Sequence, residues 1–78
     1  MKSAEHRVLR FLQAASAHES WVSYRTILNT EDLLPGDEKA LPTLMWRGLV
    51  EESAARGAYR LSEAGLNVVR RAADEQRV

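Results

Sequence analysis

The stretch GLVEESAARGAYRLSEAGL, residues 48–66, decides how this chain folds. Within it, the segments LVEES and AYRLS alternate apolar and polar residues and are joined by AARG, a pattern that predicts a β-hairpin. Gly57 gives the turn the backbone freedom that it needs. Ser62 is then the predicted N-cap of a helix, with Leu61 and Leu66 at the positions of a hydrophobic staple. Two strands this short do not fold alone, so the hairpin must pack against helices.

The segment before the hairpin, ALPTLMWRG, residues 40–48, is predicted to be a helix. Leu41, Leu44 and Met45 fall on one face at helical spacing, and Gly48 suits the left-handed residue that ends a helix. Pro42 is tolerated only in the first turn, where its missing N–H has no helical partner. The helix therefore either starts within the three residues before Pro42 and is short, or it is kinked.

The N-terminal half is predicted to contain two more helices. In residues 3–17, Leu9 lies off the apolar stripe, so this first helix is expected to have apolar surface to spare. Residues 21–29 form a shorter helix with Ser23 as its cap, Val22 and Ile27 as its staple, and Leu28 on the buried side. The residues of the first apolar stripe are Ala4, Val8, Phe11, Leu12 and Ala15.

The segment TEDLLPGDEK, residues 30–39, is predicted to be a loop, because Pro-Gly is a strong turn signal. Four of its ten residues are acidic, and we call it the acidic loop. The chain has 78 residues, which predicts one domain spanning residues 1–78. The expected fold is therefore mainly α with a small β-hairpin, in the order α-α-α-β-β-α.

Composition narrows the classes of protein that the chain can belong to. It is 45% hydrophobic and 28% charged, and it has no cysteine, which excludes disulfides and cysteine-based zinc sites. No apolar run reaches the roughly 18 residues of a membrane span, and the start lacks a signal peptide, so we expect a cytoplasmic protein. His6 and His18 lie 12 apart with no paired acid at ligand spacing. We therefore expect no enzyme activity, metal site or cofactor.

Two motifs carry a resemblance to a known family. RGLVEES, from Arg47 to Ser53, is similar to the end of a recognition helix followed by a wing, and YRLSEAGL, from Tyr59 to Leu66, is similar to the beginning of the last helix. Together they resemble the winged helix-turn-helix domains of MarR-like and PadR-like regulators. The resemblance covers about the last two-fifths of the chain, and the first two helices match in spacing only.

The resemblance implies a small regulator that binds double-stranded DNA, with the third helix in the major groove and a short wing beside it. The candidate DNA-binding residues follow from this placement and from helical geometry at about 100° per residue. Thr43 and Arg47 face outward on the third helix, where they can meet a phosphate or a base edge. Arg25, Lys39 and Arg56 are further candidates for phosphate contacts.

Charge argues against simple DNA binding and leaves an alternative open. The net charge is zero, and residues 30–48 sum to −2 on the side expected to meet phosphate. Trp46 either folds onto Leu33, Leu34 or Trp21, or it marks a surface that binds another protein, where tryptophan is enriched. The alternative is therefore a winged-helix protein–protein interaction module. The two hypotheses differ in whether the cations share one surface, with the acidic loop turned away.

The sequence also predicts how the chain associates. Leu9 on the first helix, with Val68 and Ala72 on the last, supplies apolar surface for a homodimer. A dimer doubles the number of basic residues available to DNA.

Overall fold

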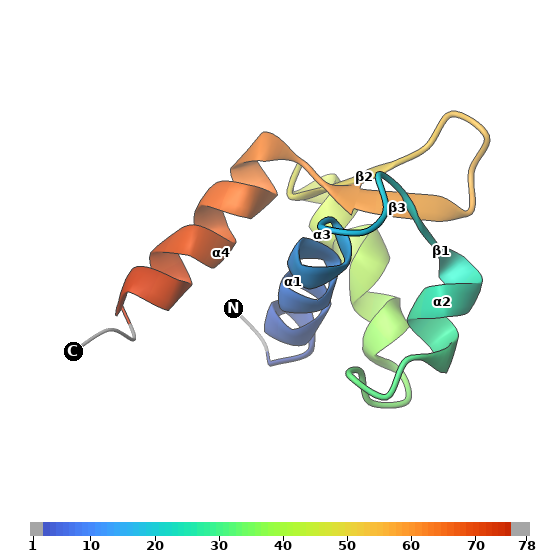
Figure 1. Cartoon of the computed structure of the whole chain (residues 1–78), viewed down its shortest axis with the longest axis horizontal. Helices are drawn as coiled ribbons and strands as arrows, with labels where there is room; N and C mark the ends of the chain where they lie inside the picture. The colour runs from blue at the N-terminus through green and yellow to red at the C-terminus, as the bar shows by residue number, and fades with distance from the viewer. Residues whose placement is uncertain (1–2, 76–78) are drawn as a thin grey trace.

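The computed structural model describes residues 3–75, apart from the side chains of Ala73 and Glu75. The N-terminal half contains α1 (Ser3–Ala15), β1 (Val22–Ser23), α2 (Tyr24–Asn29) and the 3₁₀ helix η1 (Asp37–Ala40). The C-terminal half contains α3 (Leu41–Trp46), β2 (Val50–Glu52), β3 (Ala58–Leu61) and α4 (Glu63–Glu75). Across the described residues there are thus four α-helices and a three-stranded sheet (Figure 1).

The sheet is larger than the predicted hairpin. Its strands are antiparallel in the order β1-β3-β2, so β3 lies in the centre. The hairpin of β2 and β3 is confirmed, but β1, in which Val22 pairs with Tyr59, was not predicted. The backbone N–H of Tyr24 donates to the carbonyl of Gly57 at 2.8 Å. The pairing of β1 therefore ties the start of α2 to the turn of the hairpin.

The predicted features of α3 are present. Pro42 lies in its first turn and the helix has six residues, so the short alternative is correct. Gly48 has a φ of +78°, the left-handed conformation expected of a helix-ending glycine. The N–H of Leu49 then returns to the carbonyl of Leu44 at 2.9 Å. Leu41 and Leu44 are buried, which fixes which side of α3 faces the core.

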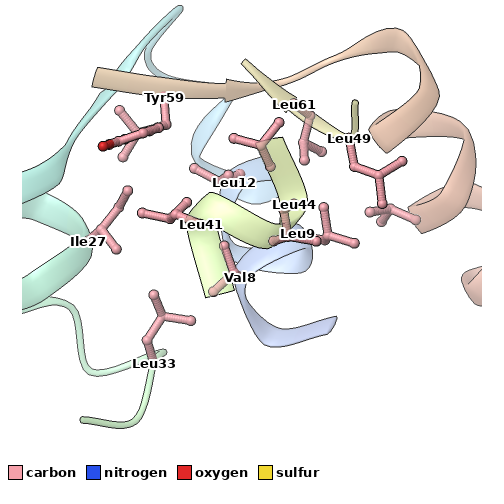
Figure 2. Packing of buried hydrophobic residues seen from close by; sticks show 13 residues of the cluster. Val8, Leu9, Leu12, Ile27, Leu33, Leu41, Leu44, Leu49, Tyr59 and Leu61 are labelled. Carbon is pink, nitrogen blue, oxygen red and sulfur yellow. The ribbon is translucent and has the colours of Figure 1, made fainter. Parts of the chain in front are cut away.

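The core joins α1, α3 and the inner face of the sheet (Figure 2). Leu9 is 1% exposed, so the prediction that it supplies spare apolar surface is wrong. α1 packs against α3 and η1 as well as α4, and it therefore buries more of its surface than one stripe. Leu28 is 50% exposed, so its predicted burial is also wrong. α2 has only one turn and a half and places Ile27 alone of its residues in the core.

The helix α4 follows β3 and packs against α1, with Val69 buried in the core, and its C-terminal end points away from the other elements (Figure 1). Ser62 caps it as predicted, because its hydroxyl oxygen accepts from the N–H of Gly65 at 3.1 Å. The same hydroxyl donates to the carbonyl of Gly48. A Cβ atom at Gly65 would collide with the carbonyl of Leu49, so the end of α3 and the start of α4 approach closely only because residue 65 is glycine.

None of the helices in residues 3–75 has the length and apolar character that a bilayer crossing needs.

Candidate nucleic-acid interface

The outward face of α3 carries three exposed side chains in a row. Lys39 on η1 and Thr43 and Trp46 on α3 are spaced four and three residues apart, which places them on one side of a helix. Trp46 is 89% exposed, so the expectation that it folds onto Leu33, Leu34 or Trp21 is wrong. Helical geometry places Trp46 on the side of α3 opposite the buried Leu44, two positions earlier.

A groove of about 310 Å³ runs beside this row, between α3, α2 and the sheet. Tyr24 and Tyr59 form its aromatic side, with ring centroids 6.2 Å apart and planes tilted by 55°. Burial raises the pKa of the Tyr59 hydroxyl, and the nearby Glu52 carboxylate raises it further, so this hydroxyl is neutral at physiological pH. The remaining residues that line the groove are Glu38, Lys39, Leu41, Pro42 and Met45.

Three of the predicted cations lie around Tyr24. Lys39 lines the groove with it, and Arg25 is the next residue along α2. Arg56 precedes Gly57, whose carbonyl accepts the Tyr24 N–H. All three are exposed, and none of their side chains forms an ion pair or a hydrogen bond with another described residue. The fold therefore brings residues from three separate segments into the neighbourhood of Tyr24, with their side chains exposed.

The acidic loop turns two of its carboxylates toward α1 instead. Asp37 is buried and accepts from Nε and Nη2 of Arg7, at 2.7 and 2.9 Å, and from the N–H of Leu34 at 2.8 Å. These hydrogen bonds, that of Arg7 foremost, hold the pKa of Asp37 below its usual range. Asp32 borders a hollow with Arg7 and Arg10 of α1. Glu38 is the member of the loop that stays at the groove.

The fourth predicted cation, Arg47, lies on the other flank of α3. Its Nη1 atom is 3.4 Å from Oε2 of Glu5 on α1, and its side chain is 42% exposed. Arg47 is therefore held apart from Arg25, Lys39 and Arg56. Arg60 pairs with Glu51 across the hairpin at 2.8 Å, and it also lies 4.2 Å from the centre of the Trp21 ring.

A second groove, of about 360 Å³, separates α1 from α4 where the sequence predicts a dimer contact. Val68 and Ala72 are half-buried and line it. Leu9 reaches it only from the core, while His6 and Arg10 give its rim a polar character. No group of three or more histidine, aspartate or glutamate side chains gathers at metal-ligand distance within the described part of the chain.

Sequence reasoning missed three features that shape the site: the strand β1, the partner of Asp37 and the place of Tyr59 in the groove. The strand β1 has only two residues, too few to show alternation, yet its pairing brings Arg56 to Tyr24. Asp37 counts as a free acid in the sequence, and its partner Arg7 lies 30 residues away with no pattern linking them. Tyr59 stands in the sequence as the first residue of the YRLSEAGL motif, and no local pattern predicts that its ring lines the groove.

The chain matches no protein-family model, no curated protein and no solved structure. Its function is therefore inferred from the arrangement of its own residues.

Proposed function

We propose that the chain is a winged helix-turn-helix domain that binds double-stranded DNA, with α3 in the major groove and the β2–β3 turn as the wing. The observation that carries this proposal is that Lys39 lines a groove with Tyr24 and that Arg25 and Arg56 lie close to Tyr24 along the backbone, while Asp32 and Asp37 turn toward α1. The DNA-binding hypothesis requires Arg25, Lys39, Arg47 and Arg56 on one surface with the acidic loop turned away; Arg47 departs from this arrangement through its pair with Glu5, and Glu38 of the acidic loop lines the groove.

Each cation has a distinct role in this proposal. Lys39 and Arg56 contact phosphates from the two sides of the groove, and Arg25 contacts the backbone from α2. Thr43 faces outward in the middle of α3, where its hydroxyl meets a base edge or a phosphate. Arg47 has to exchange the Glu5 carboxylate for a phosphate, so we expect it to contribute least.

The number of cations sets the expected affinity. Each neutralised phosphate contributes a slope of about −0.9 to the dependence of log K on log salt, so three contacts give about −2.7. Affinity then falls about 40-fold between 50 and 200 mM salt. A homodimer formed through α1 and α4, with Val68 and Ala72 at the contact, doubles this slope. The proposal includes a cytoplasmic location.

Fluorescence anisotropy with a labelled random duplex at about 50 and 200 mM salt tests the proposal. Arg56→Gln should weaken binding and lower the slope by about 1, because it removes one phosphate contact. Arg60→Gln is the matched control, since Arg60 lies in the same hairpin but is paired with Glu51. Equal effects of the two substitutions, or a slope near zero for the folded parent chain, would overturn the proposal.

A second candidate is a winged-helix module that binds another protein. Trp46, Leu28 and Leu34 are 89%, 50% and 56% exposed, and an exposed tryptophan is typical of binding hot spots. Glu38 and Glu52 near the groove lower its attraction for phosphate. Folded protein that binds no duplex at 50 mM salt would favour this candidate over the first.

A further inference from the structure

We propose that this same face takes nucleic acid with unpaired bases, a single strand or a single-stranded segment, by stacking bases on Trp46 and Tyr24. The inference rests on the proposed function in one respect: the phosphates of the strand use the same cations. It differs in the form of the ligand that the face prefers.

The first support is the exposure of Trp46. Tryptophan is highly buried on average, because its large ring gains much from leaving water. Here 89% of Trp46 is exposed. The ring thus contributes little to the stability of the fold and presents its faces to solvent.

The second support is a second aromatic ring on the same side. Tyr24 is 39% exposed and lines the groove together with Pro42. Trp46 lies one helical turn after Pro42, so the two exposed rings stand at the groove and just beyond it. Every base has a π-face, so a pair of exposed rings accepts successive bases whatever their sequence.

The third support is the placement of charge. Lys39 lies on the row that ends at Trp46, and Arg25 and Arg56 flank Tyr24. Cations interleaved with exposed aromatic rings are the combination by which proteins bind single strands, with phosphates on the cations and bases on the rings. The three cations near the groove outnumber the two carboxylates, those of Glu38 and Glu52, so charge complementarity favours a polyanion with accessible bases as the occupant.

The fourth support is what α3 lacks. A duplex is read by side chains that hydrogen-bond to base edges in the major groove. α3 has six residues, or about 9 Å of helix, and Thr43 is the one residue on its outward row that can both donate and accept such a bond. The outward face thus offers more for stacking than for reading a duplex.

The test compares a labelled oligo-dT of about 12 nucleotides with a duplex of the same length at 50 mM salt. The Trp21→Phe background leaves Trp46 as the single tryptophan, since the chain contains two. Phenylalanine keeps a ring beneath Arg60 at position 21. We expect the single strand to bind at least as tightly as the duplex and to quench Trp46 fluorescence.

Two substitutions at position 46 separate stacking from simple contact. Trp46→Leu removes the π-face and should lower single-strand affinity about tenfold, whereas Trp46→Phe should lower it less. Both should leave duplex affinity within about twofold, because no duplex contact is assigned to the ring. Circular dichroism checks that both variants fold, as expected for so exposed a side chain.

The outcomes distinguish this inference from the proposed function. Duplex binding with a weaker, unquenched single-strand complex overturns the inference and leaves the proposed function standing. Single-strand binding with quenching, but no duplex binding, supports the inference and overturns the proposed function. Absence of binding to either ligand by folded protein overturns both. Equal losses for Trp46→Leu and Trp46→Phe also overturn the inference.

Discussion

The two sides of α3 differ in what their charged residues do. On one side these residues are paired within the fold, and on the other side they face solvent. Toward α1, Asp37 is paired with Arg7, and Arg47 is paired with Glu5. Toward α2 and the hairpin turn, Lys39 and Arg56 have no charged partner among the described residues. The net charge of zero hides this asymmetry, because it counts the carboxylates of Asp37 and Glu5, which are paired on the α1 side, in the same way as exposed carboxylates.

For the proposed DNA binding, this difference means that the distribution of charge matters more than its sum. A carboxylate that is buried and fully hydrogen-bonded projects less field into solvent than one that is exposed. Asp37 therefore repels phosphate less than its count in the sequence suggests. The apolar residues of α3 differ in the same way, because Leu44 is buried and Trp46, two positions later, is exposed.

The largest expected effect is on stability and comes from truncating a buried side chain of α3. Leu44→Ala should lower the free energy of unfolding by about 3 kcal/mol, because Leu44 is 0% exposed and its removal leaves a cavity. A chain of this length is stabilised by roughly 4–12 kcal/mol, so the loss is severe. Urea denaturation measures it. Trp46→Ala is the matched control and should change stability by less than about 0.5 kcal/mol.

The next effect concerns the ion pair on the α1 side. Asp37→Ala should lower the free energy of unfolding by about 2 kcal/mol, since the N–H of Leu34 and the guanidinium of Arg7 lose their acceptor. Urea denaturation at pH 7 measures this loss. A value near zero would mean that the pair forms without stabilising the fold.

The pH dependence of stability provides an independent check on Asp37. Its pKa is lowered in the folded chain, so its contribution is present above the unfolded pKa and is lost as pH falls through the folded pKa. Below about pH 4 the parent chain should therefore lose more stability than Asp37→Asn, which has no carboxylate to protonate. Parallel curves for the two chains between pH 5 and about pH 2 would contradict the lowered pKa.

A smaller effect, on the affinity for duplex DNA, is expected from Lys39, on the side of α3 that faces α2 and the hairpin turn. Lys39→Gln should weaken duplex binding by roughly three- to tenfold at 50 mM salt and reduce the salt slope by about 1, with stability unchanged. Lys39 is exposed and has no charged partner among residues 3–75, so its removal leaves nothing unsatisfied. Anisotropy titrations beside thermal unfolding measure both quantities. A change in stability without a change in the salt slope would mean that Lys39 stabilises the fold and does not contact a phosphate.

The smallest effect is expected at Arg47, which separates the two sides. Arg47→Gln should change stability by less than about 0.5 kcal/mol, because the pair with Glu5 is long, at 3.4 Å, and the Arg47 side chain is 42% exposed, although that of Glu5 is only 10% exposed. It should also weaken duplex binding less than Lys39→Gln, since Arg47 lies outside the groove. Anisotropy on both variants makes the comparison. A larger binding loss at Arg47 would show that it leaves Glu5 to meet the ligand.

Short-range features were predictable from the sequence because each depends on residues within a few positions. Gly48 ends α3 with a positive φ, and Ser23 and Ser62 cap α2 and α4 through hydrogen bonds to residues three positions on. Pro42 placed the start of α3 correctly. For the candidate site, helical spacing correctly turned Thr43 and Trp46 outward, and every predicted cation is exposed.

The tertiary structure decided the features that depend on which elements meet. Leu9 is buried because α1 packs on more than one side, and Asp37 meets Arg7 only after η1 reaches α1. The pairing of β1 with β3 brings Arg56 to Tyr24 across more than thirty residues of chain. Caps, turns and helix faces follow from local backbone geometry, which the sequence carries by itself. The pairing of charges and the exposure of aromatic rings depend on packing between distant segments, and no local pattern contains that information.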